Sequence, residues 1–137
     1  KTLNTPCVIL EDNINSISEL IQKVQFHHLD FENSIKKVKK GDFVYLDPPY
    51  VPEDKKSFVG YNACGFDLDT HNKLFGLVRK FNSQKVKFIM SNSNTDLVNN
   101  TFVDYKKEII TARRAINSKN PADKTKEVVI FNSSPSS

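Results

Sequence analysis

The sequence predicts an α/β fold: a mainly parallel sheet with helices on its faces and an antiparallel strand pair at one end. Strand and helix patterns alternate up to Met90, and two strand patterns then follow in succession. Residues 43–46 (FVYL) and 86–90 (VKFIM) are continuous apolar runs, which are typical of strands covered on both faces. The length of 137 residues fits one domain.

The first elements follow from local patterns. Residues 13–24 predict a helix with a capping box of Ser16 and Glu19. Its buried stripe is expected at four apolar positions with helical spacing: Ile14, Ile17, Leu20 and Ile21. Residues 24–31 (VQFHHLDF) predict a short strand that ends in polar residues. Residues 32–42 predict a short basic helix or turn that stops at Gly41.

The later elements come after a long irregular loop at residues 51–67, and loops of this length are usually functional. Asp69 is predicted to cap a second helix, on which His71 is solvated. The buried stripe of this helix is expected to be Leu74, Leu77, Val78 and Phe81. The strand at 86–90 is followed by a polar turn (SNSN), a short helix at 96–100 and strands at 105–112 and 126–131, and residues 133–137 are expected to be a disordered tail.

Composition narrows the partners and the compartment. The net charge of +4 permits a polyanionic partner such as nucleic acid, and it fits a solvated lysine-rich surface equally well. Cys7 and Cys64 form no CxxC pair, which argues against a metal or redox motif. No apolar run approaches the roughly 20 residues of a membrane span, and no signal peptide is visible. We therefore expect an intracellular, cytoplasmic protein without a metal or a membrane.

Polar residues follow three of the predicted strands. Asp47 ends the strand at 43–46, Asp30 ends the preceding strand, and residues 91–94 end the following one. Ligands of open parallel sheets bind beyond the carboxyl ends of the strands. These polar clusters are therefore expected to converge on one edge of the sheet if the strands are neighbours.

The stretch Asp-Pro-Pro-Tyr at residues 47–50 suggests a chemistry. Two prolines fix the backbone, so the carbonyl of Pro48 and the carboxylate of Asp47 become two rigid acceptors. An exocyclic amino group offers two N–H donors to such a pair, and binding both directs its nitrogen lone pair towards an electrophile. Tyr50 adds a flat face on which a base could stack. The simpler reading is an ordinary turn that ends a strand.

This stretch resembles motif IV of amino-group methyltransferases that use S-adenosylmethionine. Neighbouring segments are similar to the Dam-like, D12 class DNA adenine-N6 methyltransferases: YLDPPYVPEDKKSFVGYNACGF, DLDTHNKLFGLV, VKFIMSNSNTD, ARRAINS and KEVVIFN. The resemblance covers residues 25–132. It implies a partial Rossmann-like class I methyltransferase sheet, with residues 1–132 as the C-terminal half of a catalytic domain.

The resemblance also implies roles for individual residues. Asp47 and the Pro48 carbonyl, with Pro49 and Tyr50 completing the motif, would hold the amino group of an adenine flipped out of double-stranded DNA. Asp30 and Phe31 would lie beside the adenine of the cofactor S-adenosylmethionine, together with Asp47. The residues expected near DNA are Arg113, Arg114, Tyr61 and Lys55. The reaction would need no metal.

The chain also departs from the family pattern. It lacks the glycine-rich cofactor loop, because its glycines are Gly41, Gly60, Gly65 and Gly76, and it lacks a recognition domain. The isolated chain is therefore expected to bind the cofactor weakly. It is either a fragment, which the missing initiator methionine favours, or one half that pairs with a second polypeptide. Methylation of an RNA base or of cytosine N4, and a non-catalytic half-domain that binds nucleic acid or a partner chain, remain alternatives. The recognised DNA site, and the choice between restriction-modification and regulation, stay open.

Overall fold

The computed structural model describes residues 11–53, 66–113 and 124–132. The helices are α1 (Glu11–Ile21), α2 (Phe31–Ile35), α4 (Leu68–Arg79), α5 (Phe81–Gln84) and α6 (Asp96–Thr101). The strands are β1 (Phe43–Leu46), β2 (Lys87–Ser93), β3 (Lys106–Arg113) and β4 (Lys124–Phe131). Most of the predicted loop at 51–67, the connection between the last two strands and the predicted tail lie outside the described residues.

The four described strands form one sheet in the order β1-β2-β4-β3. β1 pairs in parallel with β2, whereas β4 pairs antiparallel with both β2 and β3. The α/β class and the antiparallel pair are confirmed. The expectation of mainly parallel pairing is wrong for the described sheet, because the reversed strand β4 lies between β2 and β3. Strands β1, β2 and β3 nevertheless run in the same direction.

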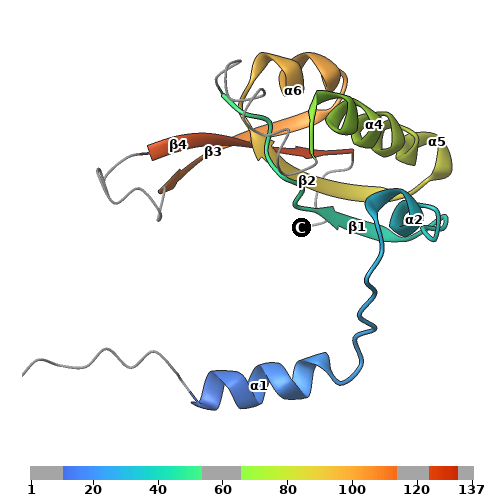
Figure 1. Ribbon diagram of the computed structural model, residues 1–137, viewed down its shortest axis with the longest axis vertical. Coiled ribbons are helices and arrows are strands. Elements are labelled where there is room, and N and C mark those ends of the chain that lie inside the picture. The colour runs from blue at the N-terminus through green and yellow to red at the C-terminus, as the bar shows by residue number, and fades with distance from the viewer. Residues whose placement is uncertain (1–10, 54–65, 114–123, 133–137) are drawn as a thin grey trace, which may run out of the picture.

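The hydrophobic core lies on one face of this sheet, where α4, α5 and α6 pack (Figure 1). Alternate residues of β2 and β4 face these helices, among them Phe88, Met90 and Ile130. Val44 and Leu46 of β1 pack against the same core. The strands therefore contribute every second side chain to the core, as the period of a β-strand requires.

The helix α4 begins and packs differently from the prediction. Its N-cap is Asp67 rather than Asp69, because the Asp67 carboxylate accepts a hydrogen bond from the backbone N–H of Thr70 at 2.9 Å. Its buried side chains are His71, Leu74, Phe75 and Val78. The expected solvated position of His71 is therefore wrong. Of the other two residues of the predicted stripe, Leu77 is half-buried, and Phe81 is buried at the start of α5.

The strand β2 is longer than its apolar run. The predicted polar turn SNSN is largely wrong, because Ser91, Asn92 and Ser93 continue the strand and pair with β4. These three polar residues are almost fully buried. Their side chains find hydrogen-bond partners in the segment that follows β1, so the strand continues without leaving most of its polar groups unsatisfied.

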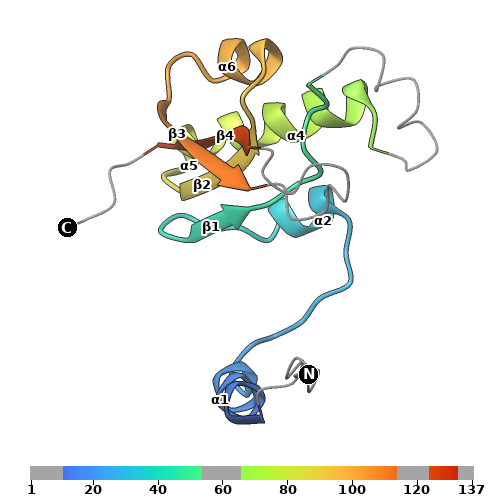
Figure 2. The ribbon, with the colours of Figure 1, turned by 90° about the vertical axis from the view of Figure 1, so that its left-hand side faces the viewer.

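The N-terminal segment forms a helix, as predicted, but does not pack as predicted. Figure 1 and Figure 2 both show α1 set apart from the sheet. The capping box is wrong, because Ser16 lies inside the helix and its hydroxyl donates to the carbonyl of Asp12. The predicted buried stripe is exposed: Ile14, Ile17, Leu20 and Ile21.

The predicted strand at residues 24–31 is also absent. Residues 24–30 have no regular structure and are exposed, and Asp30 is the N-cap of α2 rather than the end of a strand. No described strand lies alongside residues 24–30, so their backbone has no sheet ladder to join. The predicted short helix after this segment is confirmed as α2.

Candidate functional site

The segment after β1 is held against β2 by buried polar side chains. The Ser91 hydroxyl donates to Oδ1 of Asp47 at 2.9 Å. The backbone N–H of Val51 donates to Oδ1 of Asn92 at 3.0 Å, and the Ser93 hydroxyl donates to the carbonyl of Val51. The two ends of the Asp47–Val51 turn are therefore tied to consecutive residues of β2. The expected meeting of Asp47 with residues 91–94 is confirmed.

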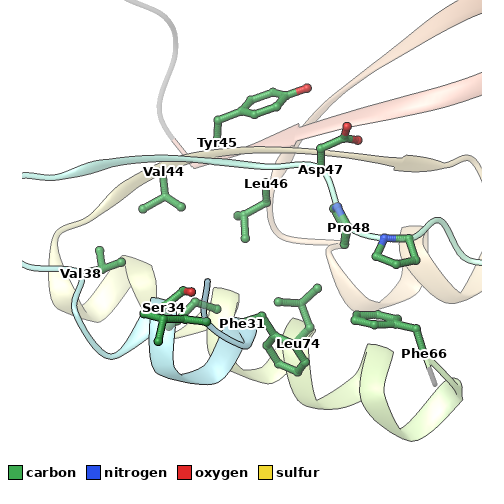
Figure 3. Close-up of a pocket in the computed structure, with 13 residues that line it drawn as sticks. Phe31, Ser34, Val38, Val44, Tyr45, Leu46, Asp47, Pro48, Phe66 and Leu74 are labelled. Carbon is green, nitrogen blue, oxygen red and sulfur yellow. The ribbon is translucent and has the colours of Figure 1, made fainter. Parts of the chain in front are cut away.

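The Asp47 carboxylate remains accessible despite this anchoring. Asp47 is an exposed residue, and its Oδ2 atom accepts no hydrogen bond from any residue that the structure describes. Figure 3 shows its side chain on the same side of β1 as Tyr45, opposite to Val44 and Leu46. One carboxylate oxygen is thus fixed by Ser91, and the other can accept a hydrogen bond from a ligand.

His71 holds the same turn from the helix side. Its side chain is 1% exposed, and its Nε2 lies 3.0 Å from the carbonyl oxygen of Pro49. Its Nδ1 lies 2.8 Å from the carbonyl oxygen of Asp67, so each ring nitrogen faces an acceptor. The ring also makes an edge contact with Phe66, with centroids 4.7 Å apart. These contacts fix the Pro49–Tyr50 peptide relative to α4.

Sequence reasoning missed His71, although a signal for it exists. Residues 71, 74, 75 and 78 form one helical stripe, so the histidine lies on the apolar face. A buried histidine needs partners for its ring nitrogens, and the nearby proline pair supplies a carbonyl. Asn92 and Ser93 were expected only as part of a polar turn. Their burial follows from the extension of β2, which polarity alone does not predict.

Tyr50 connects the turn to the reversed strand β4. It is half-buried, and its hydroxyl donates to Oε2 of Glu127 at 3.4 Å. Burial raises the pKa of the Tyr50 phenol, and the nearby carboxylates of Glu127 and Asp47 raise it further. The phenol is therefore protonated at neutral pH and keeps its hydrogen for donation.

A cavity of about 410 Å³ opens between β1 and the helices α2 and α4 (Figure 3). Its lining is mostly apolar and includes Leu29, Phe31, Leu46, Pro48 and Phe66. The rings of Phe31 and Phe66 lie 5.8 Å apart between centroids. Cavities of roughly 300–1,000 Å³ with aromatic walls are typical ligand sites. The proline pair borders this cavity, so the cavity and the turn form one site.

Asp30 and Phe31, expected beside a cofactor, differ in what they do here. Phe31 lines the cavity. Asp30 is exposed and caps α2, with one carboxylate oxygen 2.7 Å from the backbone nitrogen of Asn33 and the other 2.6 Å from its side-chain amide. The bond from the Asn33 backbone holds the pKa of Asp30 below its ordinary value. Asp30 thus acts locally as a helix cap.

The residues expected near DNA are mostly outside the described part of the chain. Arg114, Tyr61 and Lys55 fall there. Arg113 is the last residue of β3, and its backbone pairs with Lys124. Within the described ranges, no group of three or more His, Cys, Asp or Glu side chains could hold a metal ion. No helix in those ranges is long and apolar enough to cross a membrane.

Comparison with known proteins identifies similar sequences. The family model described as D12 class N6 adenine-specific DNA methyltransferase matches residues 4–116. The chain is 30% identical over 131 residues to the Type II methyltransferase M1.LlaDCHI of Lactococcus lactis subsp. cremoris, which covers 93% of this chain and 46% of that protein. It is 33% identical over 124 residues to the Type II methyltransferase M.MjaIII of Methanocaldococcus jannaschii, covering 89% of this chain and 42% of that protein.

A third relative is the retron Ec67 DNA adenine methylase of Escherichia coli. It is 30% identical over 106 residues, which cover 77% of this chain and 36% of that protein. The chain therefore spans less than half the length of each of these three relatives. The matched region includes the Asp47–Tyr50 turn and the strands on either side of it.

Proposed function

This chain belongs to the D12 class N6 adenine-specific DNA methyltransferase family, and from that premise we propose that the complete protein methylates adenine in DNA. The methyl group would come from S-adenosylmethionine, and the acceptor would be the exocyclic N6 amino group at a specific DNA site. Because the chain spans less than half of its relatives, this activity is assigned to the whole protein rather than to residues 1–137 alone.

The observation that carries the proposal is the anchored Asp47. Ser91 fixes one carboxylate oxygen, and Oδ2 is left to accept one hydrogen of an amino group. The Pro48 carbonyl would accept the second hydrogen, because the proline pair restricts the backbone beside it. Two fixed acceptors direct the nitrogen lone pair away from the ring and towards the methyl donor. Such preorganised polar groups are an effective source of rate enhancement.

Tyr50 would form the stacking surface for the target base. A base that reacts at an exocyclic nitrogen must leave the DNA duplex, and aromatic side chains commonly hold the extruded ring. The bond from Tyr50 to Glu127 supports this role, because it restrains the phenol ring at its outer end. His71 supports it from the other side by fixing the peptide that precedes Tyr50.

The apolar cavity fits the adenine end of S-adenosylmethionine. Phe31 and Phe66 offer aromatic faces to a purine, and Asp47 and Pro48 are among the residues that line this cavity. When bound, the cofactor supplies an electrophilic methyl group on a sulfonium. The residues of this chain would hold only part of it, because no glycine-rich loop is present for its remaining groups.

The sheet order supports a finer assignment of the fold. The parallel strands β1 and β2 lie next to each other, and the reversed strand β4 lies between β2 and β3. This order is compatible with part of a Rossmann-like class I methyltransferase sheet. Residues 1–132 would then be the C-terminal half of the catalytic domain. Contact with double-stranded DNA is assigned to Arg113 and Arg114, with Tyr61 and Lys55 contributing from the sequence that follows the turn. Arginine suits this role because it can make bidentate contacts with phosphates and with base edges.

The test is an Asp47→Ala variant of the complete gene product. Nucleosides of the treated DNA are separated, so that N6-methyladenine is distinguished from N4-methylcytosine. Because Asp47 is exposed, the variant should fold and keep most of its DNA affinity, whereas N6-methyladenine formation should fall by roughly 10²–10³-fold or more. Asp104→Ala, which changes an exposed carboxylate in the turn before β3, is the matched control. Full activity in Asp47→Ala would exclude the assignment.

A further inference from the structure

Asn92 is a polar side chain buried on the core side of the sheet. It is 0% exposed, and strand alternation places it on the same side of β2 as Phe88 and Met90. Its Oδ1 atom accepts two hydrogen bonds, from the backbone N–H of Val51 at 3.0 Å and from that of Ser93 at 2.9 Å. Its Nδ2 atom is buried and has no hydrogen-bond partner within the part of the chain that the structure describes. The side chain therefore serves as a buried acceptor for two backbone groups.

An apolar side chain at this position would suit the core better than the amide does. A buried donor without a partner destabilises a fold, and the neighbouring side chains on this face are apolar. Residues that depart from the local packing pattern are expected at functional sites. The N–H of Ser93 is adjacent in the same strand, whereas the N–H of Val51 comes from the segment after β1. The bond to Val51 is thus the one that joins distant parts of the chain.

Val51 is held by its backbone and by its side chain. Its N–H donates to Asn92, its carbonyl accepts from the Ser93 hydroxyl, and its side chain is 2% exposed within the hydrophobic core. Because Val51 directly follows Tyr50, these contacts fix the peptide unit that links the two residues.

The peptide unit on the other side of Tyr50 is held as well, because Nε2 of His71 lies 3.0 Å from the Pro49 carbonyl oxygen. Peptide units are planar, so the orientations of the two units that flank a residue set its φ and ψ and the direction of its Cα–Cβ bond. The direction of the Tyr50 side chain is therefore set by His71 from α4 and by Asn92 from β2. Glu127 restrains only the outer end of the ring.

We propose that Asn92 is a positioning residue for capture of the target base: through Val51 it directs the Tyr50 ring to the place where an extruded adenine stacks. This inference rests on the proposed function and deepens it at the same site. It divides the turn into two parts. Ser91 at the entry holds the carboxylate that binds the amino group, whereas Asn92 at the exit holds the ring that retains the base.

The two parts of the turn should affect different steps of the reaction. The target base must leave the duplex before it reacts, and stacking on an aromatic side chain favours the extruded base by about 5–150-fold. If Asn92 acts through the ring, its loss lowers the fraction of extruded base and leaves the reaction of an extruded base unchanged. If it acted on the amino group instead, the loss of rate would persist when the base is already unpaired.

The test compares methylation of two DNA duplexes by the complete protein. The recognised site is first read from the positions of N6-methyladenine in DNA treated with the original protein. In one duplex the target adenine is paired, and in the other an abasic position stands opposite it, so that extrusion costs less. Single-turnover rates are measured on both. We expect Asn92→Leu to lower the rate about 5–50-fold on the paired duplex and less than about threefold on the unpaired one.

Three further variants separate positioning from stability. Asn132→Leu is the matched control, because Oδ1 of Asn132 accepts the backbone N–H of Phe88 at 3.0 Å, in β2 but away from the turn. It should lower the free energy of unfolding and leave both rates within about twofold. Asn92→Asp keeps an acceptor oxygen in either protonation state and should keep the paired-duplex rate within about threefold. Ser93→Ala removes only the hydroxyl bond to Val51 and should repeat the pattern of Asn92→Leu more weakly, even if Asn92→Leu does not fold.

The inference fails on any of three results. An unchanged rate on the paired duplex would show that Asn92 does not direct the ring, and an equal loss on both duplexes would place its effect on the chemical step or on the fold. A loss in Asn92→Asp as large as in Asn92→Leu would remove the role of Oδ1. The original protein reports separately on the proposed function: if it forms no N6-methyladenine, that function fails and the inference fails with it. If it methylates both duplexes and Asn92→Leu slows both equally, only the inference fails.

Discussion

Replacing His71 by phenylalanine separates the stability of the fold from the geometry of the turn. Phenylalanine keeps an aromatic ring against Phe66 and Phe75 but removes the nitrogen that faces the Pro49 carbonyl. The Asp67 carbonyl keeps a partner, because the backbone N–H of residue 71 also donates to it at 3.0 Å. The variant therefore removes the contact of Nε2 with the turn and that of Nδ1 with the Asp67 carbonyl, whereas the backbone bond to the Asp67 carbonyl remains.

The Pro49 carbonyl faces the buried ring of His71, so the variant leaves this carbonyl without that partner, and the expected cost to stability is about 1–3 kcal/mol. The cost to turnover has a separate cause. The Pro49–Tyr50 peptide is no longer fixed, and small displacements at a reacting group can slow a reaction by roughly 100-fold. We expect turnover in His71→Phe to fall by about 10–100-fold.

The assay is single-turnover methylation of DNA by the complete protein, together with the affinities for DNA and cofactor. Phe75→Leu is the matched control, because Phe75 is 1% exposed and contacts the His71 ring, and its side chain has no polar atom that could bond to the Pro49 carbonyl. The space it leaves should destabilise the fold by about 1–3 kcal/mol, which is similar to the cost expected for His71→Phe. Its turnover should nevertheless stay within about threefold of the original protein, because this variant keeps the His71 ring that faces the Pro49 carbonyl.

Either of two results would refute this reasoning. If His71→Phe turns over at the original rate, the bond to Pro49 does not position the turn. If Phe75→Leu loses as much turnover as His71→Phe, the effect comes from the general packing of α4. His71→Gln should recover part of the rate, because its amide N–H can still donate to the Pro49 carbonyl.

Three further predictions concern the same site. Ser91→Ala frees the Asp47 carboxylate to move and should lower turnover about 10–100-fold. Because Asp47 is exposed, water can replace the lost bond, so urea unfolding should show a free energy of unfolding lower by at most about 1 kcal/mol, and a fall in stability without a fall in turnover would contradict the anchoring role. The raised pKa of Tyr50 means that the folded state favours the protonated phenol. The stability that this phenol contributes is therefore fully present below a pH of about 10 and is lost as the pH rises further. In urea titrations between about pH 9 and 11, Tyr50→Phe should lose less stability than the original protein, and parallel curves for the two proteins would refute this. Calorimetry of residues 1–137 with S-adenosylmethionine should show weak or no binding, and micromolar affinity would contradict the incomplete cofactor site.

The sequence predicts those elements of the fold that are determined by a few consecutive residues. The run FVYL and the following Asp-Pro-Pro-Tyr give both β1 and its turn, because an apolar run and a proline pair need no knowledge of distant contacts. The helix α4 was predicted, but its first residue was displaced. Asp67 and Asp69 are equally good caps in sequence, and the hydrogen bond from Thr70 decides between them.

Features that depend on distant partners were not predicted. Ser91 to Ser93 look like a turn until Val51 and Asp47 are placed beside them. The amphipathic pattern of residues 14–21 predicts burial, yet these side chains are exposed, because a pattern indicates which face is apolar and not what covers it. Residues 24–31 were also predicted as a strand from their pattern alone, but no described strand lies beside them to pair with. The order β1-β2-β4-β3 could not be read from a pattern of elements in chain order.

The inserted position of β4 has a consequence for synthesis of the chain on the ribosome. β3 pairs only with β4 among the described strands, and β4 follows it in the sequence. As translation proceeds at roughly 5–20 residues per second, β3 emerges before any strand that it can join. For about a second or longer it must stay unpaired, and its leading charges, Lys106, Lys107 and Glu108, help to keep it from aggregating during that interval.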